Sequence, residues 1–222
     1  MRFATLALIG LVALAACERR ERRPDDRIDP ATIAVGARHR LRTDAVGVDD
    51  QARPATFVLV DADNRGDEPA KVWLGGVLVD ADGHEVGRLR PEALIIPARG
   101  KRTFALVDDR QLERPTAVGA RVDVRGARRL REPELITIGQ GHTWDDHGKV
   151  VVTGMVQNRV DRPCVAVVLA GFHDADGVPM TRPFSVFQLG GGTEKPTRFV
   201  GPEGSRTGYI YVGDVQCWQP KP

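Results

Sequence analysis

The sequence predicts an all-β protein made of two tandem β-sandwich domains behind an N-terminal export segment. The first observation is a repeat: Asn64 and Asn158, and the DADG tetrapeptides at 80–83 and 174–177, are each separated by 94 positions. The second is that both repeats place a β-branched, apolar run between the Asn and the DADG turn, as in strands buried between two sheets. The third is that no stretch shows a long helical period.

The first domain is predicted to span residues 31–127. Ile33, Val35 and Leu41 indicate opening strands, and further strands are expected in a series punctuated by Pro and Gly: 57–60, 72–79, 85–89, 93–96, 103–107 and 120–124. Strands at intervals of roughly 8 to 12 residues with turn signals between them are typical of a sandwich or barrel. Each DADG is expected to end one strand and to start the next.

The second domain is predicted to span residues 134–218, after an Arg-rich connector that ends at Pro133. Its expected strands are 135–138, 149–154, 165–172, 184–189, 198–200 and 207–212. Residues 139–148 are interpreted as a hairpin loop with Asp146, His147 and Gly148 as its turn. Two units of nearly 100 residues are each large enough for a core of their own.

The N-terminus indicates export. Residues 1–16 read as a signal peptide, because a basic start precedes an apolar run, 3–14, that is too short to span a bilayer. Leu14-Ala15-Ala16-Cys17 resembles the lipobox of bacterial lipoproteins, which implies that Cys17 is acylated and becomes the mature N-terminus. The alternative is ordinary cleavage after Ala16, which leaves a free thiol.

The lipobox resemblance also implies a location. Several acyl chains on Cys17 would anchor the protein stably in a membrane. Glu18, rather than Asp, follows the cysteine, which favours the outer membrane facing the periplasm if the host is Gram-negative. Residues 17–30 are read as the lipidated cysteine and a charged spacer, because this stretch has little apolar surface to bury. Contact of its arginines with anionic lipid head groups is the alternative.

The second repeat resembles a family of surface domains. Val151 to Asn158, then Arg162-Pro163, an apolar strand and Phe172 to Gly177 are similar to the FxLYD-type and related immunoglobulin-like domains of bacterial surface proteins. The resemblance implies two immunoglobulin-like sandwiches. It assigns no catalytic residue, because sandwiches of this kind serve adhesion, binding, spacing and assembly alike.

Cysteine parity predicts a disulfide. With Cys17 acylated, Cys164 and Cys217 remain as an even pair in an exported protein, where disulfides persist. Both lie in the second domain. The alternative is a buried thiol at Cys164 and an exposed one at Cys217.

The densest group of ligand-capable residues is His142-Thr143-Trp144-Asp145-Asp146-His147. His142, Asp145 and His147 are the candidates for a metal, and Trp144 with them for a glycan, but the spacing matches no closed metal motif. A plain loop is therefore favoured and no cofactor is expected. Residues 61–67 resemble a calcium loop only superficially, since Arg65 and Val72 stand where an EF-hand needs oxygen ligands.

Charge offers one further alternative. The 32 basic and 30 acidic residues nearly balance, so no nucleic-acid partner is expected. Arg38, Arg40 and Arg42 alternate along one strand, and four more arginines cluster at the junction: Arg125, Arg128, Arg129 and Arg131. They are interpreted as solvated and edge-protecting, with an anionic envelope partner as the alternative.

No phosphate-binding loop, nucleophile elbow or paired acid and base is present in the sequence, so an enzyme is not expected. We therefore predict a lipid-anchored envelope protein that acts by contact with another envelope protein, as an interaction or assembly module. The alternative is a lipoprotein that binds a metal or glycan through residues 142–147.

Overall fold

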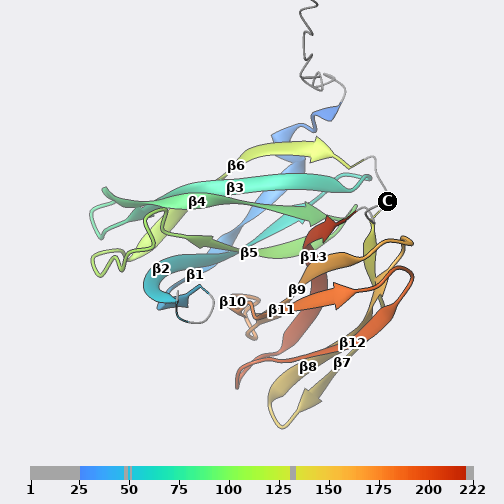
Figure 1. The fold of residues 1–222 in the computed structure, drawn as a ribbon. Coiled ribbons are helices and arrows are strands. Elements are labelled where there is room, and N and C mark those ends of the chain that lie inside the picture. Colours follow the sequence, from blue (N-terminus) through green and yellow to red (C-terminus); the bar gives the residue numbers. More distant parts are fainter. Residues whose placement is uncertain (1–25, 48–49, 51, 131–133, 219–222) are drawn as a thin grey trace, which may run out of the picture.

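The computed structural model describes residues 26–47, 50, 52–130 and 134–218 (Figure 1). Cys17 and the export segment lie outside these ranges. β-Strands make up most of the described chain, so the all-β class is confirmed. Within the described residues, no helix has the length and apolar character needed to cross a membrane.

The first half forms a sandwich of two three-stranded antiparallel sheets. One sheet has the order β1-β2-β5 and the other β4-β3-β6, and a short 3-10 helix, η2, precedes them. Apolar side chains on alternate positions, such as Val58, Val60 and Phe104, fill the space between the sheets. The elements are η2 (Pro30–Thr32), β1 (Ile33–Val46), β2 (Arg53–Asn64), β3 (Ala70–Val79), β4 (Glu85–Ile96), β5 (Lys101–Val107) and β6 (Gly119–Arg129).

The second half repeats this topology. β7, β8 and β12 pair as β1, β2 and β5 do, and β9 lies between β13 on one side and β10 and β11 on the other, as β3 lies between β6 and β4. A second apolar core, including Val152, Ala166 and Phe172, fills this sandwich. The strands are β7 (Ile136–Asp146), β8 (Lys149–Asn158), β9 (Cys164–His173), β10 (Pro179–Thr181), β11 (Phe184–Leu189), β12 (Glu194–Val200) and β13 (Thr207–Cys217).

The repeated asparagine makes the same contacts in both halves. The Asn64 amide donates to the carbonyls of Glu68, Ile96 and Pro97, and its oxygen accepts from the Gly66 N–H. Asn158 donates to Arg162, Leu189 and Gly190 and accepts from Val160. Both side chains are buried. A single buried amide thus ties the β2–β3 or β8–β9 turn to the end of a strand in the opposite sheet, which explains why the residue recurs.

Five details differ from the sequence-based expectation. The opening segment is one long strand, β1, and the two strands expected at 85–96 are one strand, β4. The expected hairpin loop at 139–148 is wrong in extent, because β7 continues to Asp146 and only His147 and Gly148, both with positive φ, form the turn. β10 and the last residues of β6, 125–129, were not expected as strand.

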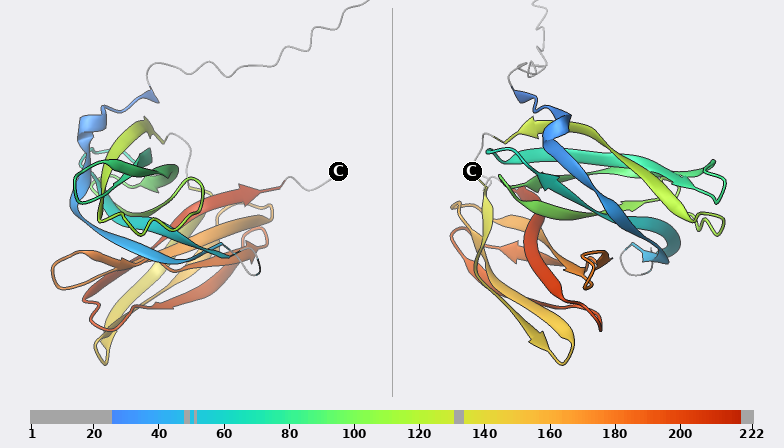
Figure 2. Two further views of the ribbon diagram at one scale, coloured as in Figure 1. Left: turned by 90° about the vertical axis from the view of Figure 1, so that its left-hand side faces the viewer. Right: turned by 180° about the vertical axis from the view of Figure 1, so that it is seen from behind.

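The main contact between the two sandwiches joins the β1-β2-β5 sheet of the first to the sheet that contains β9 in the second, and β4 lies beside it. Leu59, Asp61 and Thr103 alternate with core residues, so they lie on the outer face of the β1-β2-β5 sheet. Leu169, Gly171 and His173 lie in the same way on the outer face of β9. Figure 2 shows the β1-β2-β5 side of the first sandwich turned toward the second. Three buried polar residues, Asp61, Thr103 and His173, lie at this junction.

Candidate functional site: the junction between the sandwiches

A buried carboxylate and a buried imidazole meet at the junction. Asp61 and His173 are 6% and 1% exposed, and His173 Nε2 lies 2.9 Å from Asp61 Oδ2. The Thr103 hydroxyl donates to Asp61 Oδ1 at 2.7 Å and therefore accepts from the Tyr209 hydroxyl, 2.8 Å away. Lys101 Nζ completes the set, 3.3 Å from Asp61 Oδ2. Asp61 thus has compensating partners from both sandwiches.

Burial and these contacts shift the pKa values of Asp61, Tyr209 and Tyr211. Burial alone would raise the pKa of the Asp61 carboxyl, but the hydrogen bond and charge of His173, the Thr103 hydroxyl and Lys101 together lower it. Burial raises the pKa of the Tyr209 and Tyr211 hydroxyls. Both tyrosines are therefore neutral hydrogen-bond donors at neutral pH, and Asp61 is an anion.

A second group of side chains forms hydrogen bonds with the unpaired backbone edge of β5. Arg182 Nη1 lies 2.7 Å from Glu92 Oε1, while Glu92 Oε2 accepts from the Ala105 N–H at 2.8 Å. The Tyr211 hydroxyl donates to the Thr103 carbonyl. Because β5 pairs only with β2 among the described strands, these side chains satisfy backbone groups that would otherwise be unpaired.

The arginines of β1 contact the second sandwich. Arg40 Nη2 lies 2.8 Å from Asp174 Oδ2, Arg42 Nη1 donates to the Met180 carbonyl at 3.1 Å, and Arg38 donates to the Asp176 carbonyl. The expectation of a solvated edge was therefore incomplete. Asp174 and Asp176 of the second DADG turn are the partners of Arg40 and Arg38, whereas Arg42 pairs with Asp44 of its own strand.

Divergence between the repeats marks the junction. At the positions of Gly171, His173 and Tyr209 the first sandwich has Val77, Val79 and Arg121, as the 94-residue offset and the strand register show. A Cβ at Gly171 would lie 2.6 Å from Thr103 Oγ1 and 3.2 Å from Tyr209 Cζ. A side chain at this position would push the two sandwiches apart. Comparing the two repeats position by position is the signal that could have revealed the junction from the sequence.

The cysteines meet across neighbouring strands. Cys164 of β9 and Cys217 of β13 are directly opposite each other in the register and form a disulfide, with Cα atoms 4.0 Å apart. The first sandwich has Ala70 and Arg129 at the corresponding pair. The covalent link is therefore specific to the second sandwich.

The candidate ligand side chains of residues 142–147 do not point toward a common site. His142 and Asp145 lie three positions apart on β7, and successive side chains of a strand point to opposite faces, so these two diverge. His147 is in the turn, where Asp145 Oδ1 accepts from the Gly148 N–H. Trp144 is 43% exposed. The described residues of this segment form no group of three ligand atoms close enough to share an ion.

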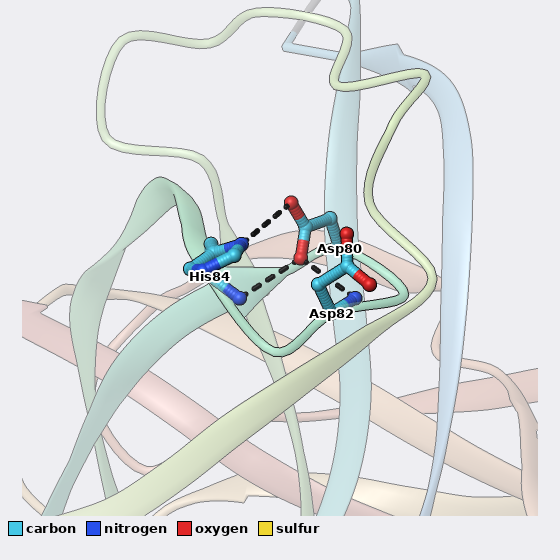
Figure 3. A group of neighbouring side chains, drawn as sticks. All are labelled: Asp80, Asp82 and His84. Atoms are coloured by element: carbon cyan, nitrogen blue, oxygen red, sulfur yellow. Dashed lines mark hydrogen bonds and ion pairs between the residues drawn. The ribbon is translucent and has the colours of Figure 1, made fainter.

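A different group does have its ligand atoms close together: Asp80, Asp82 and His84 in the first DADG turn (Figure 3). Asp80 Oδ1 accepts from the N–H groups of Asp82 and His84 at 3.0 and 2.8 Å. The backbone hydrogen bond from His84 is the main reason that the pKa of Asp80 is lowered. Asp174 makes the same two bonds to Asp176 and Val178 in the second turn. The group is explained as a turn cap that both repeats share.

Two hollows flank the junction. One, of about 560 Å³, is lined by Phe57, Leu59 and Val107 of the first sandwich and by Phe184 and Val200 of the second. The other, of about 320 Å³, lies between Ile95 and Arg102 of the first sandwich and apolar residues of β7 and β13. Both are larger than the space needed by a few water molecules.

Comparison with known proteins adds no activity. No protein-family model and no curated protein matches the chain. Among solved structures, red sea bream transglutaminase aligns with 80% of this chain at 13% identity and a TM-score of 0.25, and this chain covers only 29% of it. The tandem CBM22-1-CBM22-2 domain of Xyn10C from Paenibacillus barcinonensis aligns with 87% of this chain and 88% of its own length, at 8% identity and a TM-score of 0.16. Likenesses at such TM-scores assign no function.

Proposed function

We propose that this protein is a lipid-anchored, non-catalytic module of the bacterial cell envelope that binds a partner protein along strand β11. Cys17 would hold it at the membrane, with the outer membrane as the favoured site. The observation that carries the binding proposal is an unprotected edge strand. Among the described strands β11 pairs only with β9, and its side chains Phe184 and Val186 are 50% and 58% exposed.

The corresponding edge of the first sandwich is less open to pairing. By strand register, Pro91 and Glu92 of β4 lie at the positions of Phe184 and Ser185 of β11, and a proline and a charge commonly prevent pairing with another chain. β11 has the sequence Phe-Ser-Val-Phe-Gln-Leu, without a charge or a proline. A free apolar edge favours addition of a strand from a partner, which would pair with the β11 backbone.

The junction supports this role because it provides a fixed binding surface. Phe184 also lines the 560 Å³ hollow, whose opposite wall is formed by Phe57, Leu59 and Val107 of the first sandwich. Side chains from a partner strand would reach this hollow while its backbone pairs with β11. A rigid junction would keep the strand edge and the hollow in one orientation and reduce the entropy lost on binding.

The test uses the full chain in its own cells, with a photo-crosslinking amino acid at Gln188 of β11. We expect one dominant crosslinked envelope protein, and Val186→Lys should reduce its yield by about 10-fold or more because a buried hot-spot contact becomes a charge. Val118→Lys is the matched control, since Val118 is 65% exposed on a turn of the first sandwich. Equal yields in the two variants, or no crosslinked protein, would contradict binding along β11.

The anchor is tested separately by fractionation. Cys17→Ser should release the protein from the membrane fraction, because the acyl chains are then missing. Retention of this variant in the membrane fraction would show that the lipobox resemblance is misleading. Because Val186→Lys leaves Cys17 intact, failure of the anchor and failure of the β11 contact can be distinguished.

A further inference from the structure

The smaller hollow at the junction contains a cation without a counter-ion. Arg102, at the start of β5, lines the 320 Å³ cavity together with Ile95, Ile138 and Ile210. Its Nε atom is inaccessible to solvent and has no hydrogen-bond partner, and Nη1 donates to the Lys101 carbonyl at 2.9 Å. Its guanidinium carbon lies 4.9 Å from the centre of the Tyr211 ring. No described carboxylate lies within ion-pair distance of it.

The neighbouring arginine of the same interface, Arg182, also has a buried Nε without a hydrogen-bond partner, but it differs from Arg102 in having a carboxylate counter-ion. Arg182, also buried at the junction, has Glu92 at 2.7 Å. A partly buried cation without such a partner is costly, because it has lost water and gained little in return. Burial accordingly lowers the pKa of the Arg102 guanidinium below its ordinary value, while nearby Tyr209, Tyr211 and Glu134 oppose the shift. The site would be stabilised by an anion that enters the cavity.

We propose that this cavity binds a small organic acid, a monocarboxylate with an apolar body, whose carboxylate pairs with Arg102. The volume is at the lower end of the roughly 300–1,000 Å³ of small-molecule sites, and apolar side chains with a few polar groups are the usual lining of such sites. Lys71, Glu134 and Asp214 also line the cavity, but all three are exposed at its rim. Their charges are screened by water, so Arg102 sets the preference inside.

The probe is 4-phenylbutyrate, with 4-phenylbutyramide as a neutral analogue of the same shape. Both are titrated calorimetrically into the full chain in detergent micelles. We expect one molecule of 4-phenylbutyrate to bind per chain. 4-Phenylbutyramide should bind roughly 10-fold more weakly or worse, because a charge-assisted hydrogen bond is lost. Arg102→Gln should weaken butyrate binding by a similar factor. Arg99→Gln should not, since Arg99 pairs with exposed Asp67 on a turn outside the cavity.

A second variant keeps the proposal testable if Arg102→Gln disturbs folding. Leu135→Trp places a large side chain in the cavity and leaves Arg102 unchanged, so it should abolish butyrate binding. Absence of saturable binding to the unmodified chain would overturn the proposal. Equal affinity for butyrate and amide, or retained binding in Leu135→Trp, would overturn it as well.

Discussion

At the scale of single residues, Asp61 should make the stability of the protein depend on acid. Its pKa is lower in the folded chain than the ordinary value of 3.8, so the folded state binds this proton less tightly than the unfolded state. The stability that Asp61 contributes is therefore fully present above about pH 5 and is lost as the pH falls through its unfolded and then its folded pKa. Asp61→Asn should reduce the loss of unfolding free energy between about pH 5 and pH 3, measured by urea denaturation.

The matched control for Asp61 is Asp67→Asn. Asp67 lies in the turn between β2 and β3, its side chain is 83% exposed, and among the described residues it pairs with Arg99. An exposed pair contributes little, so this variant should keep the acid dependence of the unmodified chain. If Asp61→Asn shows the same pH dependence as Asp67→Asn, the buried pair with His173 does not contribute as inferred.

Residues differ in how far the sequence alone could predict their roles. The pairing of Cys164 with Cys217 follows from cysteine number, and the role of Asn64 as a turn residue follows from the repeat. Asp61 was considered only as part of a superficial calcium loop. Its partners Thr103 and His173 lie 42 and 112 positions away, so no local pattern could indicate them. Buried polar networks of this kind depend on tertiary contacts that no local sequence pattern displays, although comparison of the two repeats marks His173 as divergent.

At the scale of elements, strand β9 requires a glycine where it crosses the first sandwich. Gly171→Ala would place a Cβ 2.6 Å from Thr103 Oγ1. This distance is shorter than van der Waals contact, so β9 and β5 must move apart at the junction. We expect a loss of about 1–3 kcal/mol in unfolding free energy, measured by urea denaturation, as for other overpacked sites. Gly139→Ala is the control, because a Cβ there has no atom within 4 Å, and it should change stability by no more than about 0.5 kcal/mol. Similar losses in the two variants would argue against close contact at Gly171.

The elements also show where strand prediction succeeds. Runs that alternate or are fully apolar, such as those of β3, β8 and β9, were expected as strands because their side chains face a core. The later part of β7 was expected as a loop, because its residues 141–145 are exposed and polar or aromatic rather than apolar. Its strand conformation comes from pairing with β8, for example Trp144 with Val151, and this is not visible in its own composition.

At the scale of the whole molecule, the overall class and the two-sandwich organisation follow from the repeat, but the orientation of the sandwiches does not. The first sandwich contributes a sheet face and the free edge of β5, and the second contributes side chains that its own repeat partner lacks. The junction is thus built from positions at which the two halves have diverged. Such an interface couples the two sandwiches if its buried charges are paired.

This coupling gives a prediction for unfolding. The unmodified chain should unfold in a single calorimetric transition, because opening the junction exposes Arg182, Glu92 and Asp61 together. Arg182→Ala leaves the Glu92 carboxylate without its counter-ion and should weaken the junction by roughly 3 kcal/mol, so that two transitions appear, one for each sandwich. Adding Glu92→Gln should recover part of this loss, because the uncompensated charge is then removed and the two effects are not additive. Arg198→Ala is the control, since Arg198 lies on exposed β12 and only approaches Asp146 at 3.9 Å. A single transition in Arg182→Ala, at the temperature of the unmodified chain, would show that the sandwiches are joined by their packing and the β1 arginines instead.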